Sequence, residues 1–148
     1  MCGISGMVGS PEPSVVKSMT RLQHHRGPDG TGFWNDEHIS LGHSRLAIVD
    51  LQGSPQPITS NHGCILIVNG EIYNYQELRR INESYPWKTM GDSETILALH
   101  RNATHTLEHP IAEDHCNWLK QLDGMFALSL WDPVNRQLIL ARDEMGIK

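Results

Sequence analysis

The sequence predicts an α+β fold in which two stacked, mainly antiparallel sheets are covered by helices. Amphipathic helical stretches and strand-like runs alternate in groups along the chain, which is typical of antiparallel sheets packed against helices. The most apolar run is Cys-Ile-Leu-Ile-Val at residues 64–68, and such strands favour sheets that are covered on both faces. At 148 residues the chain is expected to form one domain, which buries roughly two-thirds of its unfolded surface without needing disulfides.

The first half of the chain predicts one helix and several strands. Residues 3–9 are expected to form a short strand punctuated by glycine. In residues 13–25, Val15, Val16 and Met19 share one helical face, and a proline stands near the first turn. Turn-forming residues mark 26–30 as a loop. Further strands are expected at residues 32–34, 39–43 and 46–49.

The second half predicts a buried strand, three helices and a hairpin. Residues 64–68 are too few and too β-branched for a helix, so we expect a buried strand that ends at Asn69 and Gly70. Asp92 or Ser93 is placed to cap the second of the three helices. The turn-forming residues 132–136 predict a β-hairpin. The three helices are expected at 75–81, 93–101 and 113–122, and the hairpin strands at 125–131 and 137–142.

Charge and hydropathy exclude two classes of partner. Lys and Arg number 12 against 17 Asp and Glu, a net charge of −5, and no basic cluster is present, so nucleic acid is not expected as a partner. The longest purely apolar run is far shorter than the roughly 20 residues that span a bilayer, so no membrane association is expected. The first basic residue is Lys17, which argues against a signal peptide and favours a cytoplasmic location.

The cysteines and histidines do not follow a common metal-binding pattern. Cys2, Cys64 and Cys116 lack any Cys-x-x-Cys spacing, which argues against a disulfide framework and against a zinc site. Four histidines crowd near Cys116, but their spacing also fits no common zinc pattern, so no metal site is expected. These histidines are His100, His105, His109 and His115.

Cys2 is the most informative residue for chemistry. Removal of an initiator methionine would leave a cysteine with a free α-amine, so nucleophile and base would belong to one residue. A thiol with an ordinary pKa of about 8.5 would then lie beside an amine with an ordinary pKa of about 7.7 to 8.0, which can accept the thiol's proton near neutral pH. Taken alone, Met-Cys-Gly is also compatible with an accidental N-terminal thiol.

Three further positions carry groups that suit hydrolysis of an amino-acid amide. Asn69 and Gly70 supply an amide side chain and an unhindered N–H, the components of an oxyanion hole. Arg45 can bind a carboxylate through two parallel hydrogen bonds, and Asp92 can hold an ammonium group. Each also has a plainer interpretation on its own: a turn, a surface arginine and a helix cap.

Together these segments resemble one family over essentially the whole chain. They are similar to the glutamine-hydrolysing domain of asparagine synthetase, a class II glutamine amidotransferase with an N-terminal nucleophile fold. The resemblance rests on Met1-Cys2-Gly3-Ile4, His25-Arg26-Gly27-Pro28-Asp29-Gly30, His43-Ser44-Arg45-Leu46-Ala47-Ile48-Val49-Asp50, Asn69-Gly70-Glu71-Ile72-Tyr73-Asn74 and Gly91-Asp92-Ser93-Glu94.

The resemblance implies a four-layer αββα sandwich and a role for each matching residue. Cys2 corresponds to the nucleophile, and Asn69 and Gly70 correspond to the oxyanion donors. Arg45 corresponds to the clamp on the glutamine α-carboxylate. Asp92 and Glu71 match positions that bind the α-ammonium and backbone atoms, and Ile48 and Val49 match the pocket wall. The implied reaction is hydrolysis of glutamine to glutamate and ammonia through a thioester on Cys2.

The same resemblance implies what the chain needs from elsewhere. The domain, residues 1–148, is expected to be C-terminally incomplete: it lacks its last strands and the ATP-dependent synthetase domain. The hydrolysis needs no cofactor, whereas ATP and magnesium would belong to the synthetase domain or subunit that receives the ammonia. The nitrogen acceptor and any homo-oligomer stay open. Two alternatives also remain: a glutamine-binding module without turnover, and an N-terminal-cysteine amidase that acts on another amide.

Overall fold

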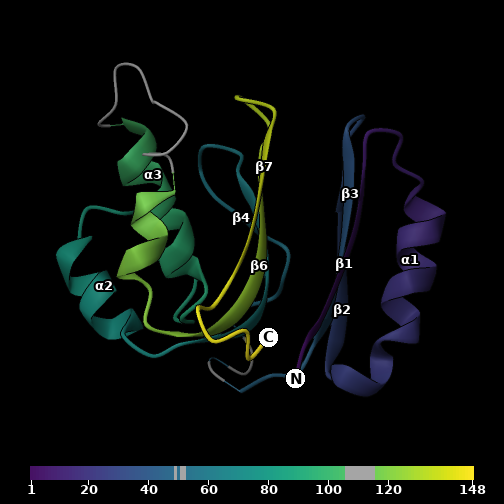
Figure 1. Cartoon of the computed structure of the whole chain (residues 1–148), viewed down its shortest axis with the longest axis horizontal. Helices are drawn as coiled ribbons and strands as arrows, with labels where there is room; N and C mark the ends of the chain where they lie inside the picture. The colour runs from purple at the N-terminus through teal and green to yellow at the C-terminus, as the bar shows by residue number, and fades with distance from the viewer. Residues whose placement is uncertain (49, 51–52, 106–115) are drawn as a thin grey trace.

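The computed structural model describes residues 1–48, 50, 53–105 and 116–148, and these form four layers (Figure 1). Helix α1 (Pro13–Leu22) covers one sheet, the two sheets face each other, and helices α2 (Tyr75–Ile81) and α3 (Glu94–His105) cover the outer face of the second sheet. The predicted αββα sandwich is therefore confirmed.

The first sheet is antiparallel and has the strand order β1-β3-β2. Its strands are β1 (Gly3–Val8), β2 (Gly30–Asn35) and β3 (Ile39–Arg45). Helix α1 buries Val16 and Thr20 against this sheet. A Cβ atom at Gly42 of β3 would lie 2.1 Å from Thr20 Oγ1, so only glycine permits this close approach of helix and strand. A short 3₁₀ helix, η1 (His24–Arg26), follows α1.

The second sheet is also antiparallel, in the order β4-β5-β6-β7. Its strands are β4 (Ile58–Thr59), β5 (Ile65–Ile72), β6 (Gly124–Asp132) and β7 (Gln137–Arg142). Side chains alternate between the two faces of β5: Leu66 and Val68 pack in the helix-side core, whereas Ile65 and Ile67 pack against the other sheet. Both faces of β5 are therefore buried over residues 65–68, as the uniformly apolar residues 64–68 predict.

Several predicted boundaries are wrong for identifiable reasons. The expected strand at 46–49 does not form in residues 46–48, because the N–H groups of Leu46 and Ala47 donate to side chains of Cys2 and Asp29. Strand β5 continues through Asn69 and Gly70, because all its residues pair with β6. The two-residue strand β4 was not predicted.

The predicted helices also differ at their ends. The first ends at Leu22 rather than at residue 25 and is followed by η1. Residues 113–115 of the third predicted helix lie outside the described residues, and its remainder forms a 3₁₀ helix, η2 (Asn117–Gln121). The predicted helix at 75–81 and the predicted hairpin are confirmed.

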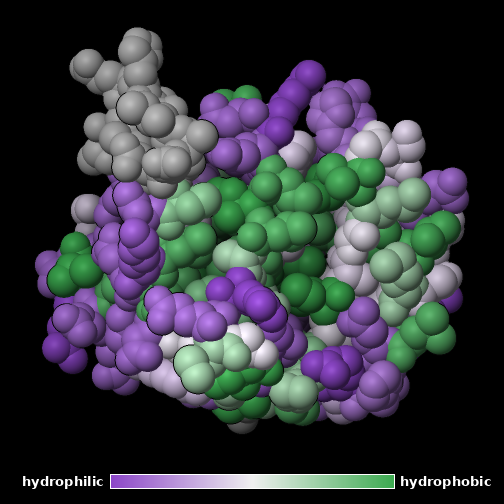
Figure 2. Space-filling model, viewed as in Figure 1, coloured by the Kyte–Doolittle hydropathy of each residue, from purple (hydrophilic) through white to green (hydrophobic). Residues whose placement is uncertain are grey.

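One face of the molecule has an apolar area at its centre, and the two chain ends lie close together (Figure 1 and Figure 2). Figure 2 shows hydrophobic side chains gathered over the centre of one face, where the edge strands β1 and β7 border the space between the sheets. The two chain ends lie near each other, and Lys148 Nζ donates to Met1 Sδ at 2.9 Å (Figure 1). None of the described helices is long and apolar enough to cross a membrane.

Candidate active site

One pocket brings together nearly all the residues that the sequence singled out. It lies where the start of β1, the end of β3, the end of β5 and the segment before α3 converge. Val49 lies outside the described residues. The predicted residues that line the pocket are Cys2, Arg45, Ile48, Asn69, Gly70, Glu71 and Asp92. These residues come from four separate segments, at residues 2, 45–48, 69–71 and 92, so the tertiary fold assembles this pocket.

Cys2 is held at the pocket by the segment that follows β3. Leu46 N donates a hydrogen bond to Cys2 Sγ at 3.3 Å, and the thiol faces Leu46 O at 3.6 Å. Arg26 Nε donates to Cys2 O at 3.1 Å, which fixes the backbone of the same residue. These contacts hold the sulfur of Cys2 at the pocket. The nitrogen of Cys2 is joined to Met1 by a peptide bond here, so removal of Met1 would be needed to free its amine.

The backbone N–H of Gly70 points away from the neighbouring strand β6. Gly70 lies opposite Phe126 in the register of β5 and β6. Phe126 directs both its backbone groups to Asp143 on the other side: its O accepts from Asp143 N at 2.8 Å, and its N donates to Asp143 Oδ2 at 3.2 Å. In an antiparallel pair that does not exchange hydrogen bonds, the backbone groups of both residues point outward. The Gly70 N–H therefore projects from the free side of β5.

The pocket lies on this free side of β5. Val68 N donates to Gln56 Oε1 at 2.6 Å, and Ile72 N donates to Asp92 Oδ2 at 2.7 Å. Gly70 lies midway between these residues, and alternate residues of a strand direct their N–H groups to the same side. Because Gln56 and Asp92 both line the pocket, the N–H of Gly70 faces the pocket between them.

Asn69 provides a second donor beside this N–H. Strand alternation places its side chain on the same face of β5 as Ile65 and Ile67, the face toward the first sheet. Its side chain is 8% exposed and has no hydrogen-bond partner within the described part of the chain. A buried amide with unused N–H groups is suited to bind an oxygen that develops negative charge. A side chain at Gly70 would clash, since its Cβ would lie 2.2 Å from Met125 O.

His43 joins the two sheets next to these donors, a role that the sequence did not reveal. Its side chain is fully buried, and its Nε2 lies 3.0 Å from Val68 O. Burial lowers the pKa of His43 from 6.5 to about 4, so the imidazole is neutral at pH 7 and donates through Nε2. The contact fixes the β5 backbone immediately before Asn69.

Arg45 lies at the end of β3 and organises the loop beyond it. Its Nη2 donates to Asp50 O at 2.6 Å. The Asp50 carboxylate accepts hydrogen bonds from Ser54 Oγ at 2.7 Å, Gly53 N at 2.9 Å and Met90 N at 3.0 Å. The Ser54 bond is the largest cause that lowers the pKa of Asp50, followed by the Met90 bond, and the charge of Arg45 also contributes. Asp50 thus ties this loop to the segment that presents Asp92.

Asp92 binds strand β5 rather than capping α3 with its side chain. Its Oδ2 accepts from Ile72 N, and its Oδ1 lies 3.4 Å from Ser93 Oγ, whereas Thr95 N donates to the main-chain oxygen of Asp92 at 3.1 Å. Of the two caps that the sequence offered for α3, Asp92 or Ser93, Asp92 thus directs its carboxylate to β5 instead. Asp92 is only 7% exposed, and Glu71 lines the same pocket. The pocket thus combines one guanidinium with two carboxyl groups.

The family model described as "Glutamine amidotransferase domain" matches residues 1–148. The chain belongs to the glutamine amidotransferase domain family.

Several curated relatives align with this glutamine amidotransferase domain over almost its full length. Asparagine synthetase [glutamine-hydrolyzing] 1 of Bacillus subtilis is 35% identical and matches 100% of this chain and 23% of its own length. Asparagine synthetase B of Escherichia coli is 35% identical, with 99% and 26% covered. The enzyme of Asparagus officinalis is 37% identical, with 99% and 24% covered. The domain therefore spans about a quarter of the length of these relatives.

Solved structures confirm the predicted sandwich fold. A glutamine phosphoribosylpyrophosphate amidotransferase from B. subtilis, complexed with ADP and GMP, has a TM-score of 0.74 and 20% identity, and it covers 98% of this domain and 38% of its own chain. A structure described as the allosteric regulatory enzyme of purine biosynthesis has a TM-score of 0.72 and 19% identity, with 98% and 38% covered. At these identities the likeness concerns the fold.

Asp29 and Arg26 of the glutamine amidotransferase domain also support the pocket, although the sequence pattern alone indicates no role for them. Asp29 supports the segment around Arg45: its N donates to Arg45 O at 2.9 Å, and its Oδ2 accepts from Ala47 N at 2.8 Å. Arg26 belongs to the same segment of sequence, residues 25–30, and supports Cys2. The motif was visible in the sequence, but its contacts with Cys2 and with residues 45–47 are tertiary.

Proposed function

We propose that this domain hydrolyses L-glutamine to L-glutamate and ammonia, with Cys2 as the nucleophile. The observation that carries the proposal is that one pocket holds a hydrogen-bonded thiol, an arginine, carboxyl groups and two N–H donors on adjacent residues. Neither donor has a partner among the residues that the structure describes. Hydrolysis of an amino-acid amide through an acyl-enzyme needs each of these groups.

The charged residues suit the zwitterionic end of glutamine. Arg45 binds the α-carboxylate, because a guanidinium can donate two parallel hydrogen bonds to it. Asp92 and Glu71 bind the α-ammonium and neighbouring backbone atoms. Ile48 and Val49 provide the apolar wall along the methylene groups. Recognition of both charged groups would direct the side-chain amide toward Cys2.

Removal of Met1 prepares the nucleophile. The freed α-amine accepts the thiol proton, and the thiolate attacks the side-chain carbonyl carbon of glutamine. The resulting oxyanion receives hydrogen bonds from Asn69 Nδ2 and Gly70 N. The carbon–nitrogen bond then breaks, the leaving nitrogen takes the proton held by the amine, and ammonia departs. Water attacks the remaining thioester with the amine as base, which releases glutamate and regenerates the thiol.

The destination of the ammonia follows from the relatives named above. Their names describe glutamine-hydrolysing asparagine synthetases, so we assign the ammonia to amide synthesis, asparagine from aspartate with ATP, in a synthetase domain or subunit. ATP and magnesium belong to that partner, and glutamine hydrolysis itself proceeds without a cofactor. The cytoplasmic location and a homo-oligomer stay predictions.

An assay of ammonia release tests this proposal. Protein whose intact mass shows the loss of Met1 is incubated with glutamine, and we expect ammonia and glutamate in equal amounts. Cys2→Ala should abolish release while it keeps glutamine binding, and Cys116→Ser, which changes an exposed cysteine, is the matched control. A glutamine analogue with an electrophilic side chain should add its mass to Cys2 alone.

Three outcomes would contradict the assignment. Substantial ammonia release by Cys2→Ala would exclude Cys2 as the nucleophile. Glutamine binding without release, in protein that has lost Met1, would select a binding module. Faster hydrolysis of another amide than of glutamine would select a different amidase.

A further inference from the structure

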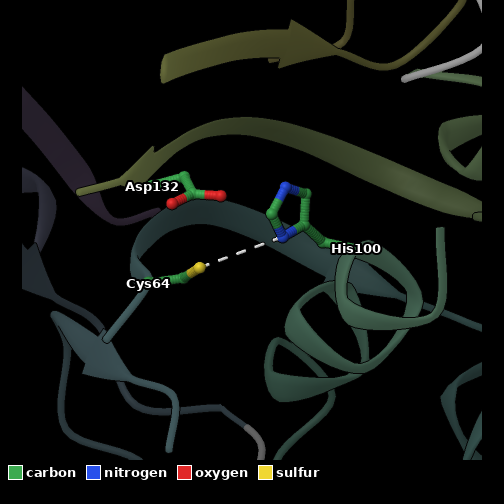
Figure 3. A group of neighbouring side chains, drawn as sticks. All are labelled: Cys64, His100 and Asp132. Carbon is green, nitrogen blue, oxygen red and sulfur yellow. Dashed lines mark hydrogen bonds between the residues drawn. The ribbon is translucent and has the colours of Figure 1, made fainter. Parts of the chain in front are cut away.

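A second cluster of reactive side chains lies at the helix-covered face of the second sheet. Cys64, His100 and Asp132 each place one potential ligand atom within 4.8 Å of the others, and Cys64 Sγ lies 4.0 Å from His100 Nδ1 (Figure 3). All three side chains are more than nine-tenths buried, with exposed fractions of 7%, 3% and 4%. None of them lines the pocket around Cys2.

The fold brings these residues together from three elements. Cys64 immediately precedes β5, and Asp132 is the last residue of β6. The last pair in the register of β5 and β6 is Ile65 with Trp131. Cys64 and Asp132 are one residue beyond this pair, so they lie across from each other at the end of the two strands. Strand alternation places Cys64 on the side of Leu66, toward the helices, where His100 of α3 meets it.

Neighbouring groups hold the side chains of Asp132 and His100 in place. Asp132 Oδ1 accepts hydrogen bonds from Val134 N at 2.9 Å and Asn135 N at 3.1 Å, and Oδ2 accepts one from Asn135 Nδ2 at 2.8 Å. A carboxylate oxygen has two lone pairs, so Oδ2 keeps one for a further partner. The His100 ring packs edge-on against Trp118, with centroids 5.8 Å apart. Outer contacts of this kind orient metal ligands.

We propose that Cys64, His100 and Asp132 form a binding site for a divalent metal ion of the zinc type. Thiolate, imidazole and carboxylate are the three side-chain ligands that zinc uses in proteins. One dication with one thiolate, one carboxylate and a neutral imidazole has no net charge, which lowers the free-energy cost of burying the complex. Binding replaces the thiol hydrogen by the metal ion and releases one proton to solvent.

The observed separations are close to those of a zinc site. Zinc–sulfur and zinc–nitrogen bonds of about 2.3 and 2.05 Å at a tetrahedral angle put the two ligand atoms about 3.6 Å apart. The Cys64–His100 separation of 4.0 Å therefore needs only a small side-chain adjustment. His62 lines the same pocket and is exposed, so its imidazole or a water molecule can take the fourth position.

A nucleophilic role for Cys64 fits the cluster less well. Burial, and then the charge of Asp132, raise the pKa of the Cys64 thiol to about 11. A reactive cysteine needs a lowered pKa. A bound metal ion would instead link the β4–β5 turn, α3 and the β6–β7 hairpin and so stabilise the fold, away from the site proposed for glutamine.

Cobalt binding gives a direct test, because a thiolate bound to Co²⁺ produces a charge-transfer absorption that histidine ligands do not. Metal-free protein is titrated with Co²⁺, and we expect this band to saturate at one ion per chain and to disappear when Zn²⁺ is added. Zn²⁺ should also raise the Tm. Cys64→Ser should lose the band and the Tm increase, whereas the matched variants Cys116→Ser and Cys2→Ala should keep both.

A second ligand variant keeps the test informative should Cys64→Ser fail to fold. His100→Gln should weaken Co²⁺ binding by at least about 10-fold, since even an outer contact of a metal site is worth that much. Absence of the charge-transfer band in the wild-type protein would overturn the proposal. So would a band that survives in folded Cys64→Ser, or one that Cys116→Ser removes.

Discussion

The buried histidine His43 should make the stability of this domain depend on pH between about 4 and 6.5. In the folded chain, burial lowers the pKa of His43 to about 4, whereas the ordinary value is 6.5. Between these values the unfolded chain binds one proton that the folded chain does not bind. The free energy of unfolding therefore rises with pH across this window, and acidification destabilises the fold.

The magnitude follows from the difference between the two pKa values. From 6.5 down to about 4 is about 2.5 pH units, and one proton contributes about 1.4 kcal/mol per unit, which gives a loss of about 3 kcal/mol. This is a large fraction of the stability of a typical domain, about 5 to 15 kcal/mol. The pKa values of Asp36, Asp50 and Asp143 are lowered from 3.8, so these carboxyl groups begin to lose their own contributions near pH 4, in wild type and in a His43 variant alike.

Urea unfolding of His43→Gln at pH 7 and at pH 4 measures this contribution. Glutamine can still donate to Val68 O through its Nε2 but does not titrate. We expect wild-type protein to lose about 3 kcal/mol more than His43→Gln between the two pH values. His24→Gln, which changes an exposed histidine, should keep the wild-type dependence. Equal pH dependence of His43→Gln and wild type would refute the reasoning.

Three further substitutions test the pocket and the packing. Arg45→Lys should raise the KM for glutamine about 30-fold, because an ammonium cannot reproduce a bidentate pair worth about 2 kcal/mol, and unchanged steady-state kinetics would remove Arg45 from the site. Asn69→Ala should lower kcat about 100- to 1000-fold with KM nearly unchanged, and an effect confined to KM would contradict an oxyanion role. Gly42→Ala should lower the free energy of unfolding by about 1 to 3 kcal/mol in urea titrations, since its Cβ would meet Thr20. Gly30→Ala is its control, because no atom lies within 4 Å of that Cβ; equal losses would argue against a packing cause.

Much of the architecture was predictable because it depends on local pattern. The uniformly apolar residues 64–68 predict a strand covered on both faces, and Leu66 and Ile67 pack into the two different cores. The hairpin around residues 132–136 was predictable from its turn chemistry. The end of β5 was not, because Asn69 and Gly70 resemble a turn in sequence, and only pairing with β6 keeps them extended.

The candidate pocket was predictable as a set of residues and not as a geometry. Motif resemblance named Cys2, Arg45 and Asp92, and the fold places all three at one pocket. Their orientation depends on groups that no motif identifies. Leu46 N donates to the sulfur of Cys2, and Ile72 N donates to the Asp92 carboxylate.

The sequence by itself determined the fold class, the family resemblance and the identity of the candidate reactive groups, because these depend on residue type and on spacing along the chain. Only the tertiary structure decided that the Gly70 N–H faces the pocket, that His43 is buried and neutral, and that Cys64 meets His100 and Asp132. Each of these depends on strand register and on the desolvation of a side chain by distant residues. Neither quantity is a local property of the sequence, since a shift of one residue in register turns every side chain of a strand to the opposite face.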